Sequence, residues 1–297
     1  MQRQDGIAQA FVAMSLVGGA ITASTYLADG RITSQAVRYA ATALVLVVVS
    51  RRRHEYDDAW RLRRPRGSGW VWLVGAATCG LTIYNLALVE ALQRADTPLV
   101  ASIVSAVPLV LALAAPLGLG QTVAGRVVFG AAIVVAGSVL VYGTGDASAT
   151  GAGLSIVALV GECAFTLLGA RVLHTVGAVS IATHTAWIAA AELAVLSVVL
   201  DGGQRTGWDL PAVGAIGYLV AASAAAFVLW FDAIESIGPA VAGLAAGAIP
   251  VAALVTGTLL GTAILTPSSL GGVVVVVAGI AVALRHSPAS KEVIVPS

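Results

Sequence analysis

Six ionisable side chains lie inside apolar stretches of this sequence, where a charge is costly. They are Arg38, Glu90, Glu162, His184, Glu192 and Asp232. On insertion scales an ionisable group in hydrocarbon costs at least about 2.5 kcal/mol, so such a group must face protein or a water-filled cavity. With a helix rise of about 1.5 Å per residue, Arg38 lies roughly 7 Å, and Glu162 and Glu192 roughly 12–14 Å, below the outer ends of their helices.

Arg38, Glu162 and Glu192 therefore fall in the outer half or the middle of the predicted membrane, where Arg38 could form a polar cluster with one of the two carboxylates. A cavity with both charge signs suits a zwitterion or another polar metabolite. A carboxyl group buried without a full counter-charge can also exchange a proton near neutral pH. The alternative is a structural ion pair that only fixes helix packing.

Neutral side chains in the same stretches are further candidates for lining a cavity. They are Thr22, Tyr84, Asn85, Thr166, Trp187 and Trp230, of which the aromatic ones could equally face lipid. Paired aspartates, HExxH and GxSxG do not occur in any apolar stretch, so we expect no enzymatic activity and no catalytic residue. Cys79 and Cys163 fit neither a metal site nor a disulfide framework, and we expect no metal or cofactor.

The elements that must position these residues are membrane-spanning helices. The 297 residues are 58% hydrophobic and 10% charged, with a mean hydropathy of +0.93, whereas soluble domains carry about 25% charged residues. Apolar runs of about 18 to 25 residues match the hydrocarbon thickness of a bilayer, roughly 30 Å. The sequence predicts an all-α integral membrane protein with ten spans, at 7–27, 33–50, 69–91, 97–117, 122–142, 153–173, 179–200, 210–234, 239–260 and 267–285.

The arginines predict how these spans are oriented. The segment 51–67, between the second and third spans, holds seven arginines, and basic residues in short loops stay in the cytoplasm. Twelve of the 16 Lys and Arg residues then fall on the cytoplasmic side and three on the other. We expect a multi-pass protein of the cell membrane with both termini in the cytoplasm. The basic segment could also contact anionic lipid, but its acidic residues and the net charge of +1 argue against nucleic acid.

The two halves of the sequence match each other at an offset of 142 residues. Glu90–Val141 falls on Asp232–Ala283, and the aligned positions include Pro108 with Pro250 and Gly130 with Gly272. Five spans separate the copies, an odd number, so the second copy enters the membrane upside down. The predicted fold is therefore two inverted five-helix repeats, 1–146 and 147–297. Such repeats are typical of alternating-access transporters, which bind substrate between the halves near the midplane; a duplicated bundle without transport is the alternative.

The repeat also suggests gates at the two membrane faces. Arg38 with Glu90 near the outer face, and His184 with Asp232 near the inner face, could form mirror-image ion pairs that close either side of a cavity. The alternative is that these four groups only reach interfacial water.

Prolines at equivalent positions are candidate hinges. A proline inside a helix removes a backbone hydrogen bond and permits a kink. Pro108 and Pro250 would place such kinks in the fourth and ninth spans, where they could serve rocking motions or be static bends.

The chain resembles the EamA-type branch of the drug/metabolite transporter superfamily over essentially its whole length. The resemblance rests on YNLALVEAL (Tyr84–Leu92), on AFVLWFDAIESIGPAVAGLAAGAIP (Ala226–Pro250), on the glycine-rich helices that end each half and on Arg38 in AVRYA. Gln121 and Thr262 stand where the family often has glutamate, and the usual aromatic of the first helix is missing around Val17–Gly19. The resemblance implies transport of amino acids, metabolites or drugs without specifying the substrate.

From these observations we expect a secondary-active transporter, an exporter of a small polar metabolite such as an amino acid, with protons as a candidate coupling ion. Its partners would be the substrate and the lipid bilayer, and it would act as a monomer or homodimer. A multidrug or toxic-compound efflux protein is the first alternative, and a non-transporting membrane scaffold is the second. A channel is disfavoured, because matched inverted halves favour alternating access over an open pore.

Overall fold

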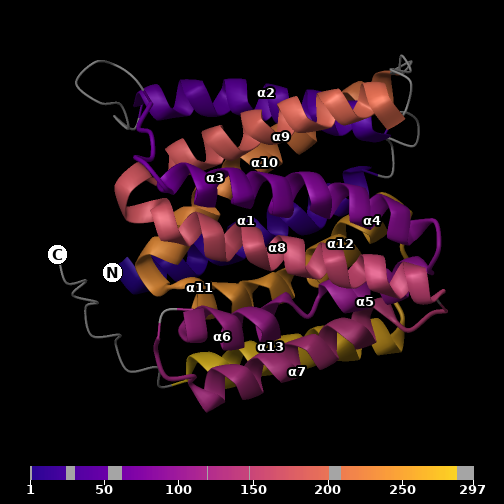
Figure 1. Cartoon of the computed structure of the whole chain (residues 1–297). Coiled ribbons are helices and arrows are strands. Elements are labelled where there is room, and N and C mark those ends of the chain that lie inside the picture. The colour runs from indigo at the N-terminus through magenta and orange to yellow at the C-terminus, as the bar shows by residue number, and fades with distance from the viewer. Residues whose placement is uncertain are drawn as a thin grey trace.

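Ten helices long and apolar enough to cross a membrane make up the computed structural model, which describes residues 2–24, 31–52, 62–118, 120–146, 148–200 and 209–285 (Figure 1). The ten predicted spans are therefore confirmed. The predicted end of the first span, residue 27, and the middle of the basic segment, 53–61, lie outside the described residues. Seven spans are single helices: α1 (Gln2–Ser24), α2 (Arg31–Arg52), α7 (Gly125–Tyr142), α8 (Ala149–Val176), α9 (Ala178–Leu200), α10 (Leu210–Ile237) and α13 (Pro267–Leu284).

The outer surface of the bundle is apolar along the length of its helices. Val71, Val195 and Val274 are each exposed by more than 60% in the middle or terminal turns of their spans. Such a continuous apolar surface marks contact with lipid rather than with water. The helix ends are closed by local capping. Ser148 and Asp209 accept a hydrogen bond from the third residue after each of them, and Gly177 and Gly238, with φ of 87° and 76°, end α8 and α10.

Three spans are interrupted in the middle. The third consists of α3 (Gly69–Ala77), the π-helix η1 (Thr78–Ile83) and α4 (Tyr84–Leu92). The fourth consists of α5 (Thr97–Val104) and α6 (Val107–Gly118), and the ninth of α11 (Pro239–Ala242), the 3-10 helix η2 (Gly243–Gly247) and α12 (Ala248–Leu259). Interruptions of this kind often mark hinges or functional sites.

The interruptions of the fourth and ninth spans precede the two matched prolines. Pro108 has no N–H to donate to the carbonyl of the preceding turn, and α5 ends four residues before it. Ala106 instead donates to Ile103 at 3.1 Å, three residues back. Pro250 follows η2 in the same way, because η2 ends three residues before it. The predicted bends are therefore present in both halves, whereas their use as hinges stays a prediction.

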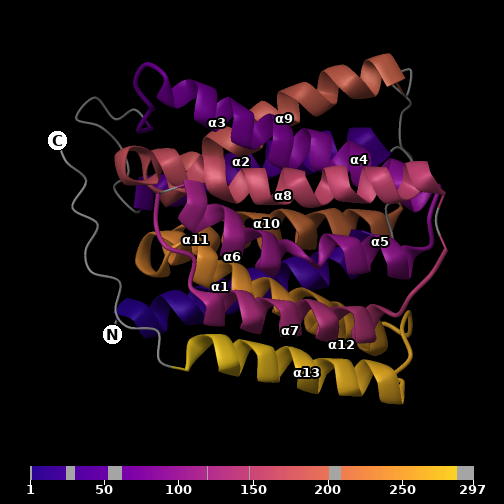
Figure 2. The same cartoon turned by 60° about the horizontal axis from the view of Figure 1, so that its bottom comes forward.

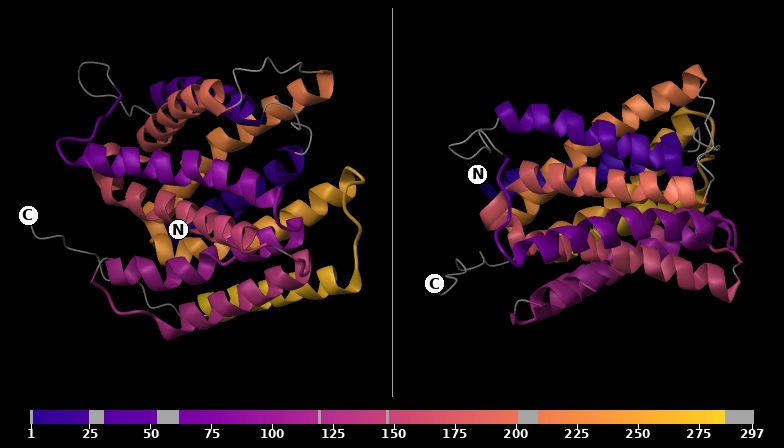
Figure 3. Two further views of the ribbon diagram at one scale, coloured as in Figure 1. Left: turned by 45° about the vertical axis from the view of Figure 1, so that its right-hand side comes forward. Right: turned by 45° about the horizontal axis from the view of Figure 1, so that its top comes forward.

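Helix contacts repeat when the two halves are exchanged. The first span packs on the eighth (α1 on α10), and the sixth packs on the third (α8 on α3, η1 and α4), so exchange of the halves turns one contact into the other. The pairs α2–α9 and α7–α13 are each their own counterpart, and Figure 3 shows them at opposite edges of the bundle. This packing confirms two inverted repeats. The exact boundary between them, at 146 and 147, stays a prediction.

The α7–α13 contact shows the inversion at the level of single residues. A methyl group added to Gly130 would lie 2.7 Å from the carbonyl oxygen of Gly279, and one added to Gly137 would lie 2.9 Å from that of Gly272. The two helices are therefore antiparallel and in backbone contact. Because α1 begins and α13 ends at the same end of the bundle (Figure 2), we name that end the inner end, after the orientation that the arginines predict, and the opposite one the outer end.

Candidate functional site

Arg38 is held against α10 rather than against a carboxylate. Its Nε and Nη2 donate to the hydroxyl oxygen of Ser223 at 3.1 and 2.7 Å, and its Nη1 donates to Oε1 of Gln35 at 3.0 Å. The guanidinium carbon lies 5.0 Å from the centre of the Tyr39 ring. A cavity of about 40 Å³, large enough for a water molecule, adjoins Arg38 between α1, α2 and α10. The positive charge is thus fixed inside the bundle.

Tyr39 and Asn85 extend this polar region toward the third span. The Nδ2 group of Asn85 donates to the Tyr39 hydroxyl at 3.0 Å and to the carbonyl oxygen of Leu81 at 2.5 Å. Both side chains are buried. A buried amide needs such partners, because an unsatisfied one costs free energy. The contact therefore joins α2 to the first turn of α4.

Glu162 and Tyr84 complete the region. Tyr84 begins α4, and its hydroxyl lies within electrostatic range of Glu162, Tyr39 and Arg38; the hydroxyl of Tyr142 is also close enough to Glu162 to interact with it. Glu162 is half-buried on α8. Within the described part of the chain, no side chain donates a hydrogen bond to its carboxylate. This carboxylate is therefore available to a proton or a ligand. We call Arg38, Tyr39, Tyr84, Asn85 and Glu162 the central cluster.

Thr166 and Trp230 close the inner side of Glu162. Thr166 lies one turn after Glu162 on α8, and the indole N–H of Trp230 donates to its hydroxyl at 3.2 Å. Both side chains are at least 95% buried. This contact joins α8 to α10 and brings two of the predicted cavity residues together, whereas their role in lining a cavity stays a prediction.

An aromatic row crosses the bundle beside the central cluster. Tyr39 stacks with Phe227 at a centroid distance of 6.4 Å, and Phe165 contacts Phe227 at 5.3 Å and Phe231 at 5.2 Å. The row joins α2, α10 and α8. It gives the polar groups an apolar wall, as is usual for sites that bind small organic molecules.

Glu192 lies outside the central cluster and has its own partners. Its Oε1 accepts from the Thr78 hydroxyl at 2.6 Å and its Oε2 from the Thr82 hydroxyl at 2.5 Å. Among the described residues Arg38 forms no ion pair with Glu162 or Glu192, because it binds Ser223 and Gln35. Its predicted polar cluster with one of the two carboxylates stays a prediction. Arg38 and Glu162 are linked only through their shared proximity to Tyr84.

Both predicted gate pairs are replaced by nearer partners. Glu90 forms an ion pair with Arg94, one turn further along the same helix. His184 uses both ring nitrogens elsewhere: Nε2 contacts the carbonyl oxygen of Arg63 at 3.0 Å, and Nδ1 accepts from Trp187 at 3.1 Å. His184 is thus not paired with Asp232, which has other interactions. Partners on the same helix or in an adjacent loop are favoured over distant ones, because such contacts cost less conformational entropy.

The other predicted residues fall in two places. Trp187 is 47% exposed, on the face of α9 that also exposes Val195, so it does not line the cluster. Thr22 and Thr256 share a hydrogen bond of 3.0 Å that joins α1 to α12.

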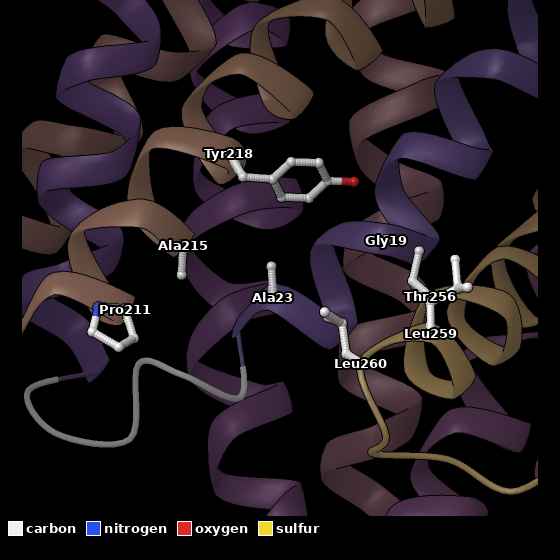
Figure 4. Close-up of a pocket in the computed structure, with 8 residues that line it drawn as sticks. All are labelled: Gly19, Ala23, Pro211, Ala215, Tyr218, Thr256, Leu259 and Leu260. Carbon is white, nitrogen blue, oxygen red and sulfur yellow. The ribbon is translucent and has the colours of Figure 1, made fainter.

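A separate cavity opens near the outer end. It has a volume of about 520 Å³ and is lined by Gly19, Ala23, Pro211, Ala215, Tyr218, Thr256, Leu259 and Leu260, from α1, α10, α12 and the residue that follows α12. Figure 4 shows the hydroxyl of Tyr218 directed across it. We call it the outer cavity. Its lining is mostly apolar, with two hydroxyl groups as its side-chain hydrogen-bonding groups.

The sequence alone did not identify Ser223, Phe165, Phe227, Thr78 or Thr82. Thr78 and Thr82 are four residues apart, a spacing that puts both on one helix face, so this signal was present. Ser223 lies in a run of alanines and had no such signal. Within the described ranges, no three His, Cys, Asp or Glu side chains gather closely enough to hold a metal ion.

Comparisons with known proteins agree with this arrangement. The model of the EamA-like transporter family matches residues 4–143 and 149–285. A solved structure described as "Crystal structure of protein" is similar to this chain with a TM-score of 0.79 and 21% identity, over 95% of this chain and 97% of that one. At that identity the likeness supports the fold alone. No match was found among curated proteins.

Proposed function

Because the chain belongs to the EamA-like transporter family, we propose that it is a secondary-active exporter of a small polar organic metabolite, such as an amino acid, and that it works by alternating access. Family membership makes the chain a transporter rather than an enzyme. The proposal adds a substrate class, a direction and a mechanism. It places the protein in the cell membrane with both termini in the cytoplasm.

One observation carries the substrate class. The hydroxyl of Tyr84 interacts electrostatically with both the Glu162 carboxylate and the Arg38 guanidinium, so groups of both charge signs lie around this one hydroxyl. Glu162 has no hydrogen-bond donor among the described residues. A zwitterion could place its ammonium group at Glu162 and its carboxylate near Arg38, because each would replace a lost hydration shell with an opposite charge.

The matched interruptions support alternating access. The breaks before Pro108 and Pro250 lie at equivalent positions of the fourth and ninth spans, which contact each other through α6, α11 and η2. Two halves related by inversion can exchange conformations, and such an exchange turns an outward opening into an inward one. The outer cavity opens near the outer end, between α1, α10 and α12.

The first test is a thermal-shift screen of the purified protein against amino acids and related metabolites, since a ligand that binds the native state raises its melting temperature. The hit is then followed as a radiolabelled compound in proteoliposomes, with and without a pH gradient. Glu162→Gln should abolish both the shift and the transport. If no zwitterion shifts the melting temperature while an uncharged compound does so in wild type and Glu162→Gln alike, the substrate class is wrong.

The outer cavity favours a second candidate, efflux of apolar or amphipathic compounds. Its volume of about 520 Å³ is in the range of pockets that take drug-sized ligands. Ala215 lines it from α10, so Ala215→Trp should fill it and remove transport of an apolar fluorescent dye. Ala225→Trp, on the exposed side of the same helix, is the matched control. Dye transport that survives Ala215→Trp would exclude this candidate.

A further inference from the structure

The π-helix η1 is held from one side by a carboxylate. Thr78 and Thr82 both direct their hydroxyls at Glu192 of α9, one to each carboxylate oxygen, at 2.6 and 2.5 Å. We call these three residues the π clamp. The clamp uses neither Arg38 nor Glu162, so the central cluster does not account for it.

The charge of Glu192 has no cationic partner. Within the described part of the chain, no Lys, Arg or His forms an ion pair with it. The elements packed against α9 are α2, α3, η1, α8 and α10. The titratable groups that they carry in the outer half or middle of the membrane are Arg38, Tyr39, Cys79, Glu162, Cys163 and Tyr218. Of these, Arg38 is bound to Ser223 and Gln35. The two threonine hydroxyls are thus the side-chain groups that the described structure places on this carboxylate.

The clamp can hold both protonation states. The ionised carboxylate accepts from both hydroxyls. When a proton binds one carboxylate oxygen, that oxygen becomes a donor, and the facing threonine hydroxyl accepts from it. The hydroxyl hydrogen of that threonine is then free to bond a carbonyl oxygen of its own helix, as the hydroxyls of Thr183 and Thr185 do in α9. Proton binding thus reverses the direction of one hydrogen bond in the clamp and adds one from a threonine hydroxyl to the backbone of η1.

A change in η1 would reach the central cluster directly. Tyr84 and Asn85 follow η1 immediately. A π-helix contains an extra residue in its turn, and one residue of an α-helix corresponds to a rotation of about 100°. Conversion of η1 to α-helix would therefore turn these two side chains relative to Glu162. The backbones also touch, since a methyl group on Gly161 would lie 2.6 Å from the carbonyl oxygen of Cys79.

We propose that Glu192 in the π clamp is a proton-binding site that couples protonation to the position of Tyr84 and Asn85. This inference rests on the proposed transport function and supplies its coupling ion. It assigns binding of the proton to Glu192, at a distance from the substrate, and leaves Glu162 free to contact the substrate.

The test uses the full-length protein and needs no substrate. Acidification of the reconstituted protein in an infrared cell produces a carbonyl band of protonated carboxyl groups. Glu192→Gln should lose a component of this band that Glu162→Gln retains. An unchanged band in Glu192→Gln would overturn the proposal.

The native thiol of Cys79 lies in η1 and reports on its conformation. Cys163→Ala leaves Cys79 as the thiol to be labelled, and we measure its rate of alkylation by N-ethylmaleimide at several pH values. This rate should depend on pH more strongly in Cys163→Ala than in the same variant with Glu192→Gln, where η1 no longer responds to protonation. The double variant Thr78→Val/Thr82→Val keeps the Glu192 carboxyl group but removes both of its hydroxyl partners. It should lose the same part of the pH dependence as Glu192→Gln, and it serves as a second test if Glu192→Gln folds poorly. Thr183→Val on α9 is the control and should behave as the background.

Equal pH profiles in the background and the clamp variants would also overturn the coupling. Because both readouts are independent of transport, their failure would leave the proposed export standing. Conversely, an intact infrared band and labelling response without any transport in proteoliposomes would reject the export and keep the proton site.

Discussion

Ser223 on α10 accepts two hydrogen bonds from Arg38 on α2, at 3.1 and 2.7 Å. A hydroxyl solvates the guanidinium without neutralising it. The charge therefore remains available to a ligand, which it would not be if a carboxylate were bound there. This relationship gives Arg38 a fixed position and a free charge.

Ser223→Ala should release Arg38 from this position and destabilise the protein. Hydrogen bonds to charged groups contribute about 1.5–3 kcal/mol, so we expect a loss of about 1–2 kcal/mol of stability after the guanidinium relaxes. Thermal unfolding in detergent measures this. Ser197→Ala is the control, because the Ser197 hydroxyl bonds the backbone of its own helix and its loss should be nearly neutral. Equal melting temperatures for the two variants would contradict the assigned role of Ser223.

Glu162→Gln should remove binding of the substrate while the protein stays folded, because the amide keeps the size of the side chain and loses its charge. The measurement is the ligand-induced thermal shift beside the melting temperature without ligand. Glu235→Gln, at an exposed position near His174, should keep the full shift. A ligand that binds Glu162→Gln as tightly as wild type would show that this carboxylate does not contact it.

Gly272→Ala should separate α7 from α13. An added methyl group would lie 2.7 Å from the carbonyl oxygen of Gly137, and overpacking of this kind typically costs about 1–3 kcal/mol. The neighbouring Gly271 faces open space, so Gly271→Ala should leave stability unchanged or slightly raise it. The measurement is the melting temperature of each variant, which should be lower for Gly272→Ala than for Gly271→Ala. A tolerated Gly272→Ala would mean that the two helices are not in backbone contact.

Pro108→Ala and Pro250→Ala should slow transport more than they affect binding. Each restores an N–H and permits a continuous helix across the interruption, so a hinge would stiffen while the central cluster remains. The readouts are initial transport rate and thermal shift for the same ligand. Pro116→Ala is the control, since Pro116 lies in α6 and its equivalent in the second half is Thr258. Unchanged rates in both hinge variants would assign the prolines to static bends.

The spans could be predicted because hydropathy and length leave few alternatives. An apolar run of about 20 residues must be a helix in lipid, where every backbone group needs an internal partner. The interruptions before Pro108 and Pro250 also followed from the chain, because proline lacks an N–H. The π-helix was not predicted, since TCGLTI (78–83) contains neither proline nor any other residue that requires it.

Side-chain pairing was the weaker part of the prediction. Trp187 and Glu192 lie on α9, and a helix that is apolar all round gives little indication of which face meets lipid. The gate pairs failed for a related reason. Their depth along the helices predicted that Arg38 and Glu90 lie close together. The depth does not say which way a side chain points, and in the structure Arg38 points to Ser223 while Glu90 pairs with Arg94.

The glycine seam between α7 and α13 has a consequence for how such a chain can arise. Gly130 faces Gly279, and Gly137 faces Gly272. At the offset of 142, Gly130 corresponds to Gly272 and Gly137 to Gly279. The two halves therefore contact each other through equivalent surfaces. A surface of this kind is self-complementary. A single five-helix ancestor could therefore have dimerised with an oppositely inserted copy of itself, and gene fusion would then have made that partnership permanent.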